Sequence, residues 1–120
     1  MAVFRILEAK ARPGSVDRLV ELLVRQNSEV VAGAAGALFA QTLRSGDQLL
    51  GVSSWRSAED LQRYLDLDVT RDFYRALPDL LMGMPSIRTY EVVGGADGAA
   101  GWGSTGSAGS SGPAGEGTQR

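Results

Sequence analysis

Two kinds of hydrophobic spacing alternate along the first 93 residues, and their order restricts the fold more than any other feature. Runs rich in β-forming residues occupy residues 3–11, 37–44, 48–55 and 87–93. Helical spacing of three and four residues separates the first run from the second and the third from the fourth. The order β-α-β-β-α-β predicts a ferredoxin-like α+β fold with a four-stranded antiparallel sheet.

Local signals predict where these elements begin and end. Residues 12–14 (Arg-Pro-Gly) predict a turn, and Ser15 is the expected N-cap of the first helix. Residues 57–60 (Ser-Ala-Glu-Asp) form a capping-box pattern, so the second helical region should begin there. An acidic break at residues 66–68 divides that region in two, and Pro78 should kink or shorten its second half.

Both faces of the predicted sheet carry apolar side chains. In the first strand Phe4 and Ile6 oppose Val3, Leu7 and Ala9; in the second, Phe39 and Leu43 oppose Leu38 and Ala40. Arg5 and Glu8 lie on opposite faces of the first strand, so they cannot form one catalytic pair there. Helices in this layout cover only one face, so we expect a homodimer packed sheet against sheet. Under the helices we expect a dry hollow that suits a flat ring system.

The composition changes after Val93. Ten of the 27 residues from Gly94 to Arg120 are glycine, and Trp102 is the only large apolar residue among them. Such a segment cannot bury enough surface to offset the entropy lost on ordering. We therefore predict one domain, residues 1–93, followed by a disordered tail, residues 94–120. Trp102 is either an exposed ring or an anchor that folds the tail over a pocket or a partner.

The composition also argues against several classes of function. The 12 Lys and Arg against 14 Asp and Glu give a net charge of −2, unlike a nucleic-acid or anionic-membrane surface. No apolar run could span a bilayer and no signal peptide is evident, so we expect a cytoplasmic protein. Without Cys or His, the chain lacks thiolate nucleophiles, Ser-His triads and the commonest metal ligands. Asp66, Asp68 and Asp72 lie at a helix start, which favours capping over metal binding.

The layout resembles the antibiotic biosynthesis monooxygenase family, whose members are dimeric α+β barrels. The similarity extends to Trp55 at the end of a strand and to the capped helix that follows it. Residues 77–90 (LPDLLMGMPSIRTY) are similar to the end of small anthrone oxygenases that tailor aromatic polyketides. Over about residues 2–93 the resemblance implies a cofactor-independent monooxygenase that uses O₂ to oxidise an anthrone or another polycyclic phenol.

Two family positions differ in this chain, and they keep two alternatives open. The family's Asn four residues before the tryptophan is Gly51, and its Tyr six residues after it is Leu61. Tyr64 lies one helical turn from Leu61 and could substitute for that tyrosine. The alternatives are a polyketide cyclase on the same fold and a non-catalytic dimeric accessory or binding protein.

The resemblance suggests three catalytic candidates. Trp55 could form the floor of an aromatic pocket, or be a core tryptophan whose N–H bonds the backbone. Tyr64 could donate a hydrogen bond to a substrate oxygen, or be a core residue with its hydroxyl at the surface. Arg75, or alternatively Arg71, could stabilise a phenolate between helix and sheet, or pair with a neighbouring aspartate at the surface.

Five residues are candidates for binding the substrate. Asn27 lies on or beside the apolar stripe of the first helix, so it is either a pocket amide or the solvated edge of the stripe. Gln41 and Arg88 are strand residues that could face the cavity. Phe73, on the apolar side of the second helical region, and Arg71 complete the set.

Overall fold

The structure is a computed structural model that describes residues 1–95. Trp102 and the rest of the predicted tail beyond Gly95 lie outside the described residues. The strands are β1 (Val3–Lys10), β2 (Ala37–Ser45), β3 (Gln48–Trp55) and β4 (Ser86–Glu91). The helices are α1 (Val16–Glu29), α2 (Ala58–Leu65) and α3 (Asp68–Ala76), with short 3₁₀ helices η1 (Val31–Gly33) and η2 (Leu77–Leu80). The predicted α+β order is confirmed.

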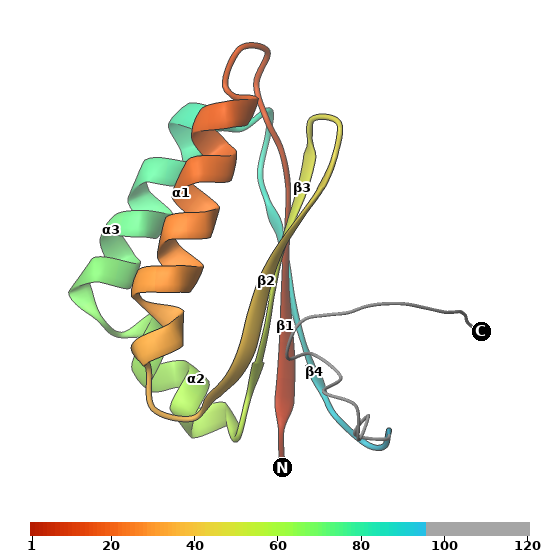
Figure 1. Ribbon diagram of the computed structural model, residues 1–120, viewed down its shortest axis with the longest axis vertical. Helices are drawn as coiled ribbons and strands as arrows, with labels where there is room; N and C mark the ends of the chain where they lie inside the picture. The colour runs from red at the N-terminus through yellow and green to blue at the C-terminus, as the bar shows by residue number, and fades with distance from the viewer. Residues whose placement is uncertain (96–120) are drawn as a thin grey trace.

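The four strands form one antiparallel sheet in the order β2-β3-β1-β4, so β1 and β3 are central. Figure 1 shows every helix on the same face of this sheet. The register places Leu7 opposite Gly51 and Ile87, and Phe4 opposite Ser54 and Tyr90. Because side chains alternate along a strand, Leu7 faces the helices and Phe4 faces away from them.

A bulge in β2 corrects one predicted orientation. The pairing of β2 with β3 shifts between Ala37 and Phe39, which leaves Leu38 out of the regular alternation and largely exposed. Beyond the bulge the prediction holds, since Ala40 packs on the helix side while Phe39 lies 5.8 Å from the Phe4 ring on the opposite face. A single extra residue is enough to turn a side chain out of the core.

The core between helices and sheet has two clusters of buried residues. One surrounds Leu7, Leu19 and Leu49 under α1 and α3, and the other surrounds Trp55 and Tyr64 under α2. Trp55 and Leu19 are fully buried. The helical stripe predicted from spacing therefore faces the sheet, as burial of one helix face requires.

The ends of the helices agree with the sequence signals except at Ser15. The Ser57 hydroxyl accepts a hydrogen bond from the Asp60 amide at 3.1 Å, so Ser57 caps α2 as predicted. Ser15 occupies the N-cap position of α1, but its side chain makes no capping bond. Pro78 lies in η2, directly after α3, and so shortens this helix as predicted.

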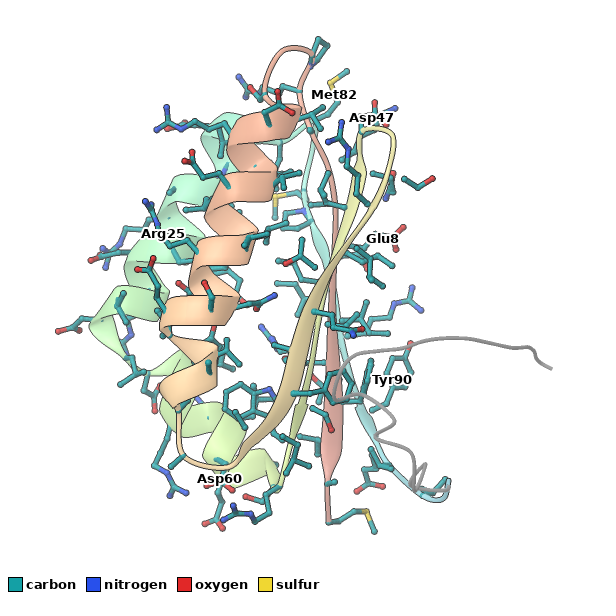
Figure 2. The ribbon with its side chains drawn as sticks, viewed as in Figure 1. Glu8, Arg25, Asp47, Asp60, Met82 and Tyr90 are labelled. Atoms are coloured by element: carbon teal, nitrogen blue, oxygen red, sulfur yellow. The ribbon has the colours of Figure 1, made fainter. Side chains whose placement is uncertain are left out.

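The face of the sheet that points away from the helices is rich in apolar side chains. Phe39, Leu43 and Tyr90 are each substantially exposed there. Figure 2 shows Tyr90 and Glu8 pointing to this side, while Arg25 points out of the opposite, helical layer. We call this surface the open face. Within the described residues no helix is both long and apolar enough to cross a membrane.

Candidate functional site

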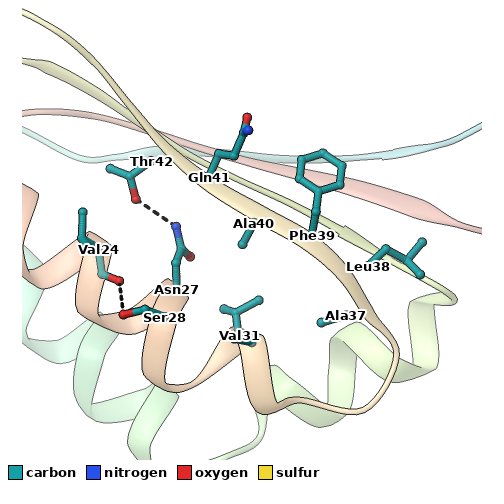
Figure 3. A pocket seen from close by; sticks show the side chains of 11 residues that line it. Val24, Asn27, Ser28, Val31, Ala37, Leu38, Phe39, Ala40, Gln41 and Thr42 are labelled. Atoms are coloured by element: carbon teal, nitrogen blue, oxygen red, sulfur yellow. Dashed lines mark hydrogen bonds between the residues drawn. The ribbon is translucent and has the colours of Figure 1, made fainter. Parts of the chain in front are cut away.

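A groove runs between α1 and the edge strand β2. Its volume is about 530 Å³, and typical small-molecule sites fall in the range of about 300–1,000 Å³. One wall is made by Val24, Asn27 and Ser28 of α1, with Val31 and Ala32 of η1. The other wall is made by residues 37–42 of β2, as Figure 3 shows. The groove is large enough for a ligand of several rings.

A second, inner cavity lies beneath the helices and corrects the expectation of a wide hollow. Its volume is only about 30 Å³. Benzene occupies engineered cavities of about 150 Å³, so no aromatic ring fits here unless side chains move. Leu23 and Phe73 line this cavity from the helices, and Leu7 lines it from the sheet. Packing has filled the space that the fold pattern predicted to be open, and the room for rings lies in the groove.

Several polar side chains face the inner cavity despite its small size. Gln26 donates from Nε2 to the Tyr64 hydroxyl at 2.8 Å and to Thr70 Oγ1 at 3.4 Å. All three residues are buried. Burial raises the pKa of Tyr64, and the hydrogen bond from Gln26 and the charge of Arg5 only partly oppose this effect. Tyr64 therefore stays neutral at ordinary pH and keeps its hydroxyl proton.

Arg5 places a positive charge at the inner cavity. It comes from the central strand β1 and pairs with Ser53, so its side chain lies on the helix-facing side of the sheet. One guanidinium nitrogen donates to the Tyr74 hydroxyl at 3.1 Å, and the guanidinium carbon lies 5.9 Å from the centre of that ring. A charged donor in a confined site is well placed to stabilise an anionic oxygen.

Asn27 separates the groove from the inner cavity. It lines both spaces, as does Val31. Its amide nitrogen donates to Thr42 Oγ1 at 2.9 Å, so the side chain bridges α1 and β2 (Figure 3). Asn27 is thus placed at a pocket wall, and its role in binding a substrate stays a prediction.

The structure places three other predicted residues under the helices. Tyr64 and Phe73 line the inner cavity. Trp55 lines neither space; it is fully buried, and its ring lies 4.9 Å from the Tyr64 ring. Its indole N–H donates to Ser53 Oγ at 2.9 Å rather than to the backbone. Trp55 therefore packs against the Tyr64 ring and does not contact a ligand in either space.

The remaining predicted residues are not brought together with these. Arg75 pairs with Asp72, Arg71 pairs with Asp66, and both arginine side chains are mostly exposed. The expected place for one of them, between helix and sheet, is taken by Arg5 instead. Gln41 belongs to the β2 wall of the groove, but its side chain points away from α1, on the side of β2 that carries Phe39 (Figure 3). Arg88 is on the open face, where a hydrogen bond with Tyr90 raises its pKa further.

Four residues that line the inner cavity were not predicted from the sequence: Arg5, Gln26, Ser53 and Tyr74. For Arg5 a signal exists, because alternation puts it on the same face as Leu7 and Ala9, where a charged residue is unusual. Gln26 likewise follows Leu19 and Leu23 at helical spacing. Ser53 and Tyr74 carry no comparable signal. In the part of the chain that the structure describes, no cluster of carboxylates could hold a metal ion.

No protein-family model and no curated protein sequence matches this chain. Solved structures do share its fold. The Rv0793 protein of Mycobacterium tuberculosis is 17% identical, with a TM-score of 0.75 over 81% of this chain and 100% of that one. A candidate antibiotic biosynthesis monooxygenase of Deinococcus radiodurans is 18% identical, with a TM-score of 0.73 over 79% and 96% of the two chains.

A mutant of SnoaB, a cofactor-independent oxygenase of Streptomyces nogalater, also has this fold. It is 13% identical, with a TM-score of 0.70 over 78% of this chain and 95% of that one. The resemblance to the antibiotic biosynthesis monooxygenase fold is therefore confirmed in three dimensions. At these identities the likeness is one of fold, and function has to be argued from the site.

Proposed function

We propose that this chain is a cofactor-independent monooxygenase that oxidises an acidic aromatic, such as an anthrone or another polycyclic phenol, with O₂. The observation that carries the proposal is the guanidinium of Arg5, which faces the inner cavity behind a groove of about 530 Å³. The groove accommodates the rings, and Arg5 stabilises the anionic oxygen at their inner edge. The fold shared with a cofactor-independent oxygenase supports the same assignment.

The donors at the inner cavity match the needs of such a reaction. The substrate loses a proton to give a phenolate, whose negative charge is shared with a ring carbon. Arg5 and the neutral hydroxyl of Tyr64 stabilise that charge. Among the residues lining the two spaces there is no carboxylate. The substrate therefore enters as its anion, and its proton remains in solvent.

The reaction balances with O₂ as the only oxidant. The anion transfers one electron to O₂, and the two resulting radicals combine into a C–O bond of a peroxide. Uptake of a proton and loss of water then leave a ketone. A ring CH₂ and one O₂ thus become a C=O and one H₂O. The protein's part is to orient the anion and to hold its charge.

Oxygen consumption with the anthrone dithranol tests the proposal. Arg5→Met should lower kcat/KM by about tenfold or more, equivalent to about 1.4 kcal/mol of lost stabilisation. Arg25→Met is the matched control, because Arg25 is exposed on the outer side of α1 and should leave the rate unchanged. Uptake no faster than the uncatalysed rate, or equal rates for the two variants when both are folded, would overturn the assignment.

A non-catalytic binding protein is the second candidate, and the lining of the two spaces favours it. No carboxylate among the lining residues could take a proton from a bound substrate. Such a protein would bind the aromatic without consuming O₂. Tight dithranol binding under nitrogen, together with no uptake in air, would select this function over the oxygenase and would equally fit a cyclase.

We also propose that the protein works as a homodimer through its open face. Phe39, Leu43 and Tyr90 expose apolar surface there, next to the Phe4 ring. The exposed face of an antiparallel sheet is ordinarily polar, because solvent covers it. A second copy brings an equally apolar surface to the contact, and cyclic dimers are the commonest closed assemblies.

A further inference from the structure

The charge distribution along the two adjoining spaces is strongly asymmetric. Arg5 supplies one positive charge at the inner cavity. Along the groove, none of the lining residues in the described chain is charged. Asn27 and Val31 line both spaces, so the uncharged groove adjoins the cavity that holds the guanidinium.

We infer that the groove and the inner cavity form one binding site for an elongated aromatic with a single acidic oxygen at its inner end and an uncharged body. The body lies along β2, and the acidic oxygen points past Asn27 toward Arg5. The inference rests on the proposed function, because it assigns the polarity and the orientation of the substrate at the same site.

The groove suits an uncharged body for two reasons. Val24, Val31 and Leu38 offer apolar surface to the faces of a ring system. Ser28 offers a hydroxyl oxygen at the rim, and this oxygen can accept a hydrogen bond from a neutral hydroxyl of the ligand. A carboxylate on the body would lose hydration here and find no opposite charge, which costs more free energy than the contact returns.

Asn27 determines how far the acidic end can enter. Its hydrogen bond to Thr42 lies at the boundary between the groove and the inner cavity. A ligand that reaches Arg5 has to separate this pair, and its own oxygen can then replace Thr42 as the acceptor for the Asn27 amide. Because one hydrogen bond replaces another, a ligand that carries such an oxygen separates Asn27 from Thr42 at little cost in free energy.

Blocking the groove tests the position of the body. Ala32→Phe places a ring in the groove, whereas Ala35→Phe places the same ring at an exposed residue of the same segment that does not line it. Calorimetry should show Ala32→Phe weakening aloe-emodin, a three-ring phenol with a neutral hydroxymethyl group, by about tenfold or more. Ala35→Phe should change this affinity by less than about twofold. Equal effects of the two variants would overturn the inference.

A change of ligand charge tests the polarity of the groove. Rhein carries a carboxylate where aloe-emodin carries its hydroxymethyl group, and should bind wild-type protein about tenfold more weakly. Ser28→Lys adds a positive charge at the rim and should reduce the difference in affinity between rhein and aloe-emodin. Gln62→Lys adds the same charge at an exposed position of α2 and should not. Rhein binding as tightly as aloe-emodin would overturn the inference.

The inference and the proposed function can fail separately. If Arg5→Met weakens binding and lowers oxygen uptake while Ala32→Phe does neither, the inference is wrong and the oxygenase assignment stands. If Ala32→Phe weakens aloe-emodin but Arg5→Met changes neither binding nor uptake, the Arg5 end of the site and the proposed function are both wrong. Circular dichroism of each variant confirms that the fold is retained.

Discussion

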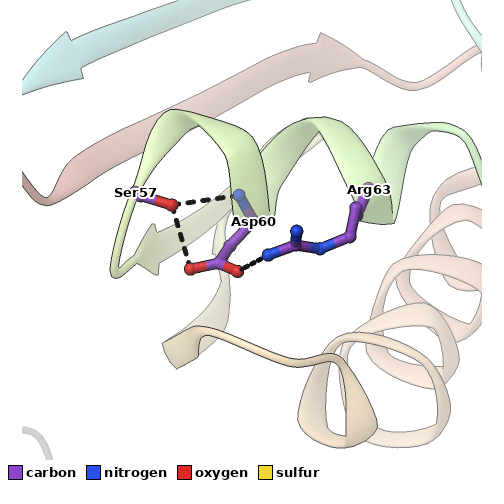
Figure 4. A network of polar contacts seen from close by, with 3 residues as sticks. All are labelled: Ser57, Asp60 and Arg63. Carbon is purple, nitrogen blue, oxygen red and sulfur yellow. Dashed lines mark hydrogen bonds and ion pairs between the residues drawn. The ribbon is translucent and has the colours of Figure 1, made fainter.

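The backbone of Gly36 packs directly against the carboxylate of Asp60. Gly36 has a φ of +83°, and a Cβ built on it would overlap the Asp60 side chain. Asp60 cannot move away, because Ser57 Oγ donates to it at 3.0 Å and Arg63 forms an ion pair with it (Figure 4). The contact joins the turn before β2 to the first turn of α2, and so it fixes one end of the groove wall.

Gly36→Ala should therefore destabilise the fold more than its backbone conformation alone explains. A left-handed alanine costs about 1–2 kcal/mol, and overpacking adds about 1–3 kcal/mol. Gly83→Ala is the control, because Gly83 has a φ of +85° but open space around its Cβ position. Urea unfolding followed by circular dichroism measures both. Equal losses in the two variants would show that the Asp60 contact is unimportant.

Acid should remove part of the stability through Asp60. The hydrogen bond and charge of Arg63, then the Ser57 hydroxyl, lower the pKa of Asp60 below its ordinary value of 3.8. A carboxyl with a lowered folded pKa contributes stability that is present above the unfolded pKa and lost as pH falls through the folded pKa.

The difference in unfolding free energy between wild type and Asp60→Asn should be constant above about pH 5 and shrink below about pH 4. Denaturant titrations at a series of pH values measure it. Glu59→Gln removes the exposed carboxylate of the preceding residue and controls for net charge. A difference that stays constant down to pH 2.5 would contradict the role given to Asp60.

The order of elements was predictable because a helix or strand buried on one side repeats its apolar residues at a characteristic spacing. That spacing is visible in the local sequence. The stripe of Leu19 and Leu23 and the alternation of Leu7 and Ala9 both point at the core that the structure contains. Ser57 was predictable for a different reason, since its cap needs only groups three residues apart. The bulge at Leu38 depends on pairing with β3, which no local pattern of β2 encodes.

The site was harder to predict, because its geometry depends on how helices pack. Because the chain breaks before α3, the spacing of apolar residues in α2 does not show which side of α3 faces the sheet. The exposed positions of Arg71 and Arg75 could therefore not be derived from that spacing. Arg5 could have been placed without knowing how the helices pack, because alternation along β1 already puts it on the buried face. The inner cavity is lined by Leu23 of α1 and Phe73 of α3, so its size depends on how two helices pack together.

The bond between Gln26 and Tyr64 predicts coupled effects on stability. Tyr64→Phe leaves the Gln26 amide with Thr70 at 3.4 Å as its remaining side-chain partner. Gln26→Met leaves the buried Tyr64 hydroxyl without its donor. Each change should cost about 1–3 kcal/mol of unfolding free energy, because it strands a buried polar group. The double variant should cost less than the sum by about 1 kcal/mol. Additive losses in urea unfolding would rule out the coupling.

A charge on the open face should separate the proposed dimer. Leu43 and Leu67 are each 43% exposed, but Leu43 is on the open face and Leu67 precedes α3 in the helical layer. Leu43→Lys would bury a lysine without an assigned partner in the contact, whereas Leu67→Lys would leave its charge in solvent.

Light scattering after gel filtration at micromolar concentration should therefore show a dimer for wild type and for Leu67→Lys. The same measurement should show a monomer for Leu43→Lys. The wild-type Tm should also rise with protein concentration, because association stabilises the folded chain by mass action. A wild-type monomer whose Tm does not depend on concentration would mean that water, and not a second copy, covers Phe39 and Tyr90.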